Sequence, residues 1–152
     1  MIKTNALNFK YNDQASFSFP DINLGKDENL LIIGSSGIGK TTLLHLLAGL
    51  LGSNSGSINL YGQDISKLTQ HQIDKFRGQN IGIVFQKPHF VNSLTVKENL
   101  QLAQYLGNKE DQNRIIDVLS SLDILDKQNK KPKKLSQGEK QRASIAMAIV
   151  NS

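Results

Sequence analysis

The chain has 152 residues, of which 38% are hydrophobic, so it can form one folded core but is short for two domains. Its net charge is +5 and it contains no cysteine, which excludes disulfides and favours a reducing compartment such as the cytoplasm. No apolar run is long enough to span a bilayer, and the first residues, MIKTNALNFKYND, lack the pattern of a secretion signal.

The N-terminal third predicts a β-hairpin, a buried strand and a helix. Residues 6–11 and 16–19 alternate in part between apolar and polar side chains, and the sequence NDQA between them is typical of a turn. Residues 30–33, LLII, are fully apolar, as buried parallel strands are. Residues 40–50 predict a helix because leucines recur there at helical spacing.

The middle of the chain predicts two further strands around a surface helix. Residues 57–61 alternate again and follow the loop sequence GSNSG. Residues 65–76 are polar with spaced apolar positions, which indicates a surface helix. The sequence IGIVF at residues 81–85 predicts a second buried strand, and Gln86 closes it.

Helices are predicted after residue 87. Thr95 and Glu98 fit a capping box that starts a helix running to about Leu106. Residues 114–122 carry apolar side chains on one helical face. A lysine-rich stretch follows, and a last helix begins at Ser136.

The sequence GSSGIGKT at residues 34–41 matches the phosphate-binding P-loop pattern, between a predicted strand and a predicted helix. Its glycines let backbone N–H groups point at phosphate oxygens, and the helix adds its positive end. Lys40 would bring a charge to the β- and γ-phosphates, and the Thr41 hydroxyl would bind Mg²⁺. We expect nucleotide contacts along the whole loop: Gly34, Ser35, Ser36, Gly37, Ile38, Gly39, Lys40, Thr41 and Thr42.

Other interpretations of this loop are weaker. A glycine-rich turn with a chance lysine is disfavoured because the residue pattern and its context agree. A dinucleotide site is excluded because its Gly-x-Gly-x-x-Gly fingerprint is missing. Since kinases, GTPases and motor ATPases all carry a P-loop, the loop alone does not decide the function.

The segment KKLSQGEKQRASIAMAIV, at residues 133–150, resembles the signature motif of ABC-transporter ATPases, usually Leu-Ser-Gly-Gly-Gln. NIGIVFQ resembles that family's Q-loop strand, with Gln86 as the glutamine, and LTVKENL resembles the start of its helical subdomain. Tyr11 stands where the family carries an aromatic residue that stacks on adenine. The segment DISKLTQHQIDKFRGQNIGIVFQ is most similar to the sequences of the branch that drives lipoprotein release, macrolide or peptide export, and cell division.

The resemblance implies an α/β fold, with a P-loop NTPase core, an N-terminal antiparallel β subdomain and a helical subdomain. It divides the chain into a β subdomain with the P-loop core at residues 1–86, a helical subdomain at 87–134, and the signature motif with its helix at 135–152. This is one ABC ATPase domain, truncated before the Walker B strand.

The resemblance also implies roles for residues outside the P-loop. Gln86 would contact Mg²⁺ and the attacking water, while Ser136, Gly138 and Glu139 would face the nucleotide of a second protomer. Two ATPase modules would then meet head to tail with ATP between them. A structural role stays open for each residue: Ser136 and Glu139 fit a capping box, Tyr11 an edge strand, and Gln86 the end of a strand.

Two residues depart from the usual signature, and further motifs are not among the 152 residues. Gln137 replaces the first glycine and Glu139 replaces the glutamine. The family's strand ending in Asp-Glu, which holds Mg²⁺ and polarises the attacking water, is not found, nor is the later H-loop histidine. We expect the N-terminal portion of a longer protein, without hydrolysis of its own.

The implied function is the ATP-binding subunit of a bacterial ABC transporter, an ATPase that works as a dimer with a transmembrane permease at the cytoplasmic face of the inner membrane. The alternatives are a soluble ABC ATPase acting on ribosomes or nucleic acid, and an ATP-binding fragment without catalysis. Only the lysine run supports nucleic acid. The run consists of five lysines: Lys127, Lys130, Lys131, Lys133 and Lys134. Such a run is usually a solvated loop, and no aromatic residue is interleaved here for base stacking. No nucleic-acid partner is therefore expected.

Overall fold

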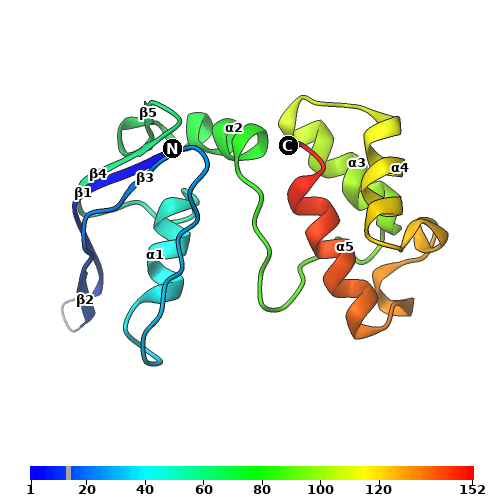
Figure 1. Ribbon diagram of the computed structural model, residues 1–152, viewed down its shortest axis with the longest axis horizontal. Helices are drawn as coiled ribbons and strands as arrows, with labels where there is room; N and C mark the ends of the chain where they lie inside the picture. Colours follow the sequence, from blue (N-terminus) through cyan, green and yellow to red (C-terminus); the bar gives the residue numbers. More distant parts are fainter. Residues whose placement is uncertain (13–14) are drawn as a thin grey trace. The chain divides into compact units, whose positions relative to one another are not determined.

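The computed structural model describes residues 1–12 and 15–152 (Figure 1). These residues form two compact units, residues 1–73 and residues 74–152. Part of the predicted turn NDQA, residues 13–14, lies outside the described residues. The boundaries expected at residues 86 and 134 remain a prediction.

The first unit contains an antiparallel sheet. Its strands are β1 (Ile2–Asn12), β2 (Ala15–Ser18), β3 (Asn23–Leu24), β4 (Ser55–Leu60) and β5 (Gln63–Asp64). The strand order is β2-β1-β4-β5, and β3 pairs with the start of β1. Phe9 lies opposite Phe17 in the β1–β2 pair, so the predicted hairpin is confirmed, and β4 confirms the strand predicted near residues 57–61.

A β-bulge interrupts the β1–β4 pair. The register shifts between Asn5 and Asn8, and Ala6 between them has a φ of 48°. Gly56 of β4 has a φ of +89°, and a Cβ atom there would lie 2.5 Å from the carbonyl oxygens of Asn5 and Ala6. Glycine is therefore required at this position, because only a residue without a side chain allows so close an approach.

The helix predicted at residues 40–50 is α1 (Lys40–Leu47), which is shorter than expected. Ala48 caps its C-terminus, and Gly49 follows with a φ of +64°. A glycine in this left-handed conformation commonly ends a helix. Spaced leucines therefore predicted the buried face of α1 but not its last residue.

The helix predicted at residues 65–76 is wrong in its bounds. The structure has a short 3₁₀ helix, η1 (Ile65–Lys67), and then α2 (Gln70–Asn80). The Asp64 side chain accepts a hydrogen bond from the backbone N–H of Ser66 and so starts η1. Thr69 accepts one from the N–H of Gln72 at the start of α2. Two local capping residues therefore divide one apolar pattern into two helices.

The second unit is helical in its described residues after Asn80. It contains α3 (Val96–Gly107), α4 (Gln112–Ser121) and α5 (Gln137–Ile149), with the 3₁₀ turns η2 (Leu125–Lys127) and η3 (Pro132–Lys134) (Figure 1). The three predicted helices are therefore confirmed. They pack around one apolar core: Val96, Leu100, Ile115, Val118, Leu119, Ile124, Leu135, Ala143, Ala146 and Val150. No helix in the described part of the chain is long and apolar enough to cross a bilayer.

Asn151 joins three segments of the second unit. Its side-chain amide donates to the carbonyl oxygen of Gly78 in α2 at 3.0 Å and to that of Ala103 in α3 at 2.9 Å. A Cβ atom at Gly107 would lie 2.4 Å from the same amide nitrogen and 2.6 Å from the Gly78 oxygen. The ends of α2 and α3 can therefore approach Asn151 only because residues 78 and 107 have no side chains.

The two buried parallel strands predicted at residues 30–33 and 81–85 are wrong as secondary structure, because neither range forms a strand. Leu31 is 79% exposed and Ile33 is 82% exposed. A parallel strand needs neighbours that pair with its backbone and cover both of its faces. Within residues 1–12 and 15–152 no strand pairs with either segment. Gly82 instead packs so tightly on α5 that a Cβ atom there would overlap the carbonyl of Ala148.

Candidate functional site

The predicted P-loop leads directly into α1. Gly37 has a φ of +84° and Gly39 a φ of +99°, a region that favours glycine. Gly39 is the N-cap residue of α1, so the helix begins at Lys40 without a side-chain cap. The first N–H groups of an α-helix have no partner within the helix and carry its positive end. The glycines therefore leave the N-terminus of α1 open to an anion.

Lys40 folds back over the loop. Its ammonium group donates hydrogen bonds to the carbonyl oxygens of Gly34 and Ser35, both at 2.7 Å. An ammonium group has three donors, so one remains for a further acceptor. Thr41 is exposed and Thr42 is buried. The loop thus presents a cation and a hydroxyl group at the start of the same helix.

The β1–β2 hairpin places aromatic rings against this loop. The rings of Phe9 and Tyr11 meet edge to face with centroids 4.7 Å apart, and those of Phe17 and Phe19 are stacked. A Cβ atom at Gly39 would lie 2.7 Å from Cδ1 of Phe17, so ring and loop are in contact. The aromatic cluster therefore supports the side of the P-loop.

Tyr11 reaches the start of α1 through its hydroxyl group. Its Oη atom lies 3.2 Å from Oγ1 of Thr42, within hydrogen-bond distance, while the residue is 56% exposed. The sequence interpretation gave Tyr11 a contact with adenine or a place in an edge strand, and it gave no role to Phe17 or Phe19. Their spacing carried a signal, because Phe9 and Tyr11, like Phe17 and Phe19, are two residues apart and share a face of an extended strand.

The predicted signature residues lie at the start of α5, in the second unit. The Ser136 Oγ atom accepts from the N–H of Glu139 at 3.3 Å, and Oε2 of Glu139 accepts from the N–H of Ser136 at 2.7 Å. Ser136 and Glu139 therefore form a capping box. Gln137 and Gly138 are exposed beside them. The hydrogen bond from the Ser136 backbone is the main cause that lowers the pKa of Glu139, and Lys127 adds to it.

The predicted site residues are divided between the two units. Tyr11 and the P-loop belong to the first unit, while Gln86 and the signature residues belong to the second. Gln86 is exposed, and the ring of the preceding Phe85 lies edge-on to His89. Each unit therefore carries its own part of the predicted site.

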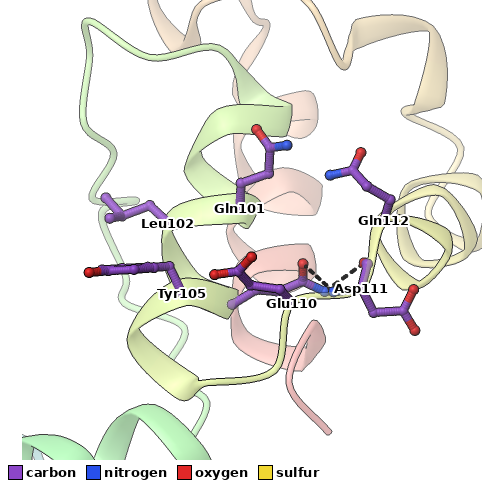
Figure 2. A pocket seen from close by; sticks show the side chains of 7 residues that line it. Gln101, Leu102, Tyr105, Glu110, Asp111 and Gln112 are labelled. Atoms are coloured by element: carbon purple, nitrogen blue, oxygen red, sulfur yellow. Dashed lines mark hydrogen bonds between the residues drawn. The ribbon is translucent and has the colours of Figure 1, made fainter.

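A separate hollow of about 470 Å³ lies between the end of α3 and the start of α4 (Figure 2). The buried Gln104 accepts from the Asp111 N–H at 3.1 Å and donates to the Asp111 carbonyl at 2.8 Å. Its polar side chain is therefore used to close the α3–α4 connection. Seven residues line the hollow: Gln101, Leu102, Gln104, Tyr105, Glu110, Asp111 and Gln112. None of them is a predicted site residue.

Comparison with known proteins decides the family. The profile of the ABC transporter family matches residues 19–152. The chain belongs to this family. Lipoprotein-releasing system ATP-binding protein LolD of Bacteroides thetaiotaomicron is 31% identical, over 99% of this chain and 71% of that protein. The LolD protein of Wigglesworthia glossinidia brevipalpis is 34% identical over 95% of this chain and 65% of that protein. The LolD protein of Bacteroides fragilis is 33% identical over 86% of this chain and 62% of that protein.

Solved structures confirm the predicted fold class of this ABC ATPase. The dimeric structure of MJ0796, a bacterial ABC transporter cassette, has a TM-score of 0.89 and 26% identity, over 99% of this chain and 70% of that one. A dimeric post-hydrolysis state of MJ0796 bound to ADP and Pi gives the same values. CbiO1 of Clostridium perfringens, part of the ABC transporter complex cbiONQ, has a TM-score of 0.80 and 28% identity, over 99% of this chain and 61% of that one.

Proposed function

We propose that this ABC ATPase binds ATP with Mg²⁺ at residues 34–42. The observation that carries the proposal is the open start of α1, where the Lys40 ammonium group lies over the loop with one donor unused. A triphosphate would accept hydrogen bonds from the loop backbone and from Lys40. The exposed ring of Tyr11 would contact adenine, since aromatic rings stack on bases.

The residues present fit a magnesium ion that is held jointly with the nucleotide. Mg²⁺ prefers oxygen ligands and usually takes only one or two from the protein, the others coming from phosphates and water. Thr41 offers an exposed hydroxyl group at the N-terminal end of α1. Gln86, which is exposed in the second unit, is proposed as a ligand separately, from the family resemblance. Bound there, the ion would neutralise charge on the β- and γ-phosphates.

The second part of the proposal concerns assembly. The MJ0796 cassette is a dimer, and CbiO1 is part of a transporter complex. We propose that this ATPase pairs head to tail with a second cassette, so that Ser136 and Gly138 of one protomer face the nucleotide in the P-loop of the other. ATP hydrolysis by the full-length pair would then drive a membrane permease, as part of a system like those that release lipoproteins.

Binding of a fluorescent ATP analogue tests the nucleotide site. Lys40→Ala should abolish most binding because the triphosphate loses its cation. Lys26→Ala removes an exposed lysine from the same unit and should leave binding unchanged. Equal affinities of Lys40→Ala and the unsubstituted protein would overturn the assignment.

The role of the signature motif needs a separate measurement. Ser136→Arg in the full-length protein should abolish nucleotide-dependent dimerisation and hydrolysis, because a large cation blocks the start of α5. Binding of the ATP analogue to the P-loop should remain. If Ser136→Arg loses both functions together, Ser136 supports the fold and does not contact a partner's nucleotide.

A further inference from the structure

Lys127 differs from the other lysines of the run between α4 and α5. Its side chain is only 24% exposed, whereas Lys130, Lys131, Lys133 and Lys134 are all exposed. The Lys127 ammonium group forms ion pairs with Asp126 and with Glu139, where Nζ and Oε1 are 3.5 Å apart. The Asp126 side chain is 66% exposed and that of Glu139 is 19% exposed. Water can therefore solvate Asp126 without Lys127, but it solvates Glu139 far less.

Both oxygens of the Glu139 carboxylate contact residues of the same chain. One oxygen of Glu139 accepts from the Ser136 backbone, and the other faces Lys127. The carboxylate thus completes the capping box while its charge has a partner. Without that partner, a negative charge in the first turn of α5 would lie beside Ser136 and Gly138. This is the place where the proposed function puts the triphosphate of a second cassette, which like charge would repel.

We infer that Lys127 is a positioning residue for the pairing of two cassettes: by neutralising Glu139, it lets the start of α5 accept the triphosphate held by the partner. The inference rests on the proposed function. It explains how the motif works with a glutamate where the family usually has a neutral glutamine. That glutamine could complete the same capping box without a counter-charge, because the capping-box motif has either Glu or Gln at this position.

The test measures self-association of the full-length protein by sedimentation velocity with a non-hydrolysable ATP analogue. Lys127→Met should weaken association about fivefold, because the Glu139 carboxylate would then face the partner's triphosphate without a counter-charge. Glu139→Gln should associate at least as well as the unsubstituted protein. The double variant Lys127→Met/Glu139→Gln should match Glu139→Gln, because a neutral side chain at residue 139 needs no counter-charge. The loss in Lys127→Met should shrink as salt is raised.

Controls separate this charge effect from a structural one. Lys133→Met removes a lysine of the same run that forms no ion pair among the described residues, and it should leave association unchanged. Lys127→Arg keeps the charge and should also retain association. All variants should bind the fluorescent ATP analogue like the unsubstituted protein.

Two results would overturn the role of Lys127 and leave the proposed pairing in place. One is association of Lys127→Met as strong as that of the unsubstituted protein. The other is a double variant as weak as Lys127→Met, which would make Lys127 a packing residue. If the unsubstituted protein does not associate with nucleotide at all, the proposed pairing fails and this inference fails with it. The unsubstituted protein could associate with nucleotide and Ser136→Arg could lose that association, while the Lys127 variants differ from expectation. The pairing would then stand, and the role of Lys127 would be rejected.

Discussion

Tyr11 can contribute to nucleotide binding through two different groups. The residue is 56% exposed, whereas its hydroxyl group lies 3.2 Å from Oγ1 of the buried Thr42. Removing the hydroxyl group therefore tests the contact with α1 and leaves the ring for adenine.

We predict that Tyr11→Phe weakens ATP and inorganic triphosphate equally, by about fivefold for one hydrogen bond of about 1 kcal/mol. Tyr11→Ala should weaken ATP further, because stacking of a base on an aromatic ring contributes about 1–3 kcal/mol. Competition against the fluorescent ATP analogue gives both affinities. Unchanged binding in Tyr11→Phe would leave the hydroxyl group without a role. Equal losses of ATP and triphosphate in Tyr11→Ala would reject adenine stacking.

Gly39 and Gly37 form a natural matched pair. Both have positive φ angles, but a Cβ atom meets the Phe17 ring at Gly39 and nothing within 4 Å at Gly37. We predict that Gly37→Ala destabilises the first unit only by the backbone strain, about 1–2 kcal/mol. Gly39→Ala should destabilise it more and should also weaken ATP binding, since the hairpin must move away from the loop. Equal losses in denaturant unfolding would show that the contact with Phe17 adds nothing.

The start of α3 offers a test at the level of one element. Thr95 and Glu98 cap the helix reciprocally, and the hydrogen bond from the Thr95 backbone is the main cause that lowers the pKa of Glu98. A lowered pKa in the folded state means that the ionised carboxylate stabilises the fold. This contribution is complete above the ordinary value of 4.5 and is lost as the pH falls through the lower folded value.

We predict that Glu98→Gln lowers the unfolding temperature at neutral pH and that its difference from the unsubstituted protein shrinks below pH 4.5. Thr95→Ala should cost about 1 kcal/mol, because the cap is lost. Glu110→Gln changes a carboxylate that caps no helix and serves as the control. A Glu98→Gln difference that is the same at every pH would contradict the ionic contribution of this cap.

Helices with local signals were predictable, whereas the secondary structure of two apolar runs, which depends on distant pairing, was not. The capping boxes of α5 and α3 could be predicted because the two residues of each box, Ser136 with Glu139 and Thr95 with Glu98, are only three positions apart in the sequence. The apolar runs at residues 30–33 and 81–85 lacked such local information. Whether they form strands depends on which backbone pairs with them. The ion pair of Lys127 with Glu139 was missed for a similar reason, because the two residues meet only once η2, η3 and α5 have folded.

At the scale of the whole chain, the exposed apolar segment before the P-loop has consequences in solution. Leu31 and Ile33 are more than three-quarters exposed, and their backbone has no strand partner among the described residues. We predict that the 152-residue chain self-associates as its concentration rises, because an exposed apolar segment with an unpaired backbone can pair with other chains. Light scattering measures this, and Leu31→Asn with Ile33→Asn should reduce it.

Val91→Asn is the control for that experiment, because it changes a partly exposed apolar residue in the other unit. It should leave the scattering unchanged. A chain that stays monomeric over the whole concentration range would show that exposed side chains at residues 31 and 33 are tolerated.

The contact of Asn151 with Gly78 and Gly107 also limits which sequences can occupy this fold. A library that varies one of these positions at a time should accept almost nothing at residues 78 and 107, because even the Cβ of alanine would collide with a backbone oxygen or with the Asn151 amide. A library that also varies residue 151 should recover few further variants. A Cβ atom at residue 78 would lie 2.5 Å from the Leu106 carbonyl oxygen, and one at residue 107 would lie 2.6 Å from the Gly78 carbonyl oxygen, and a smaller side chain at residue 151 moves neither oxygen. The close approach of two backbone segments therefore limits residues 78 and 107 more strictly than the Asn151 side chain does.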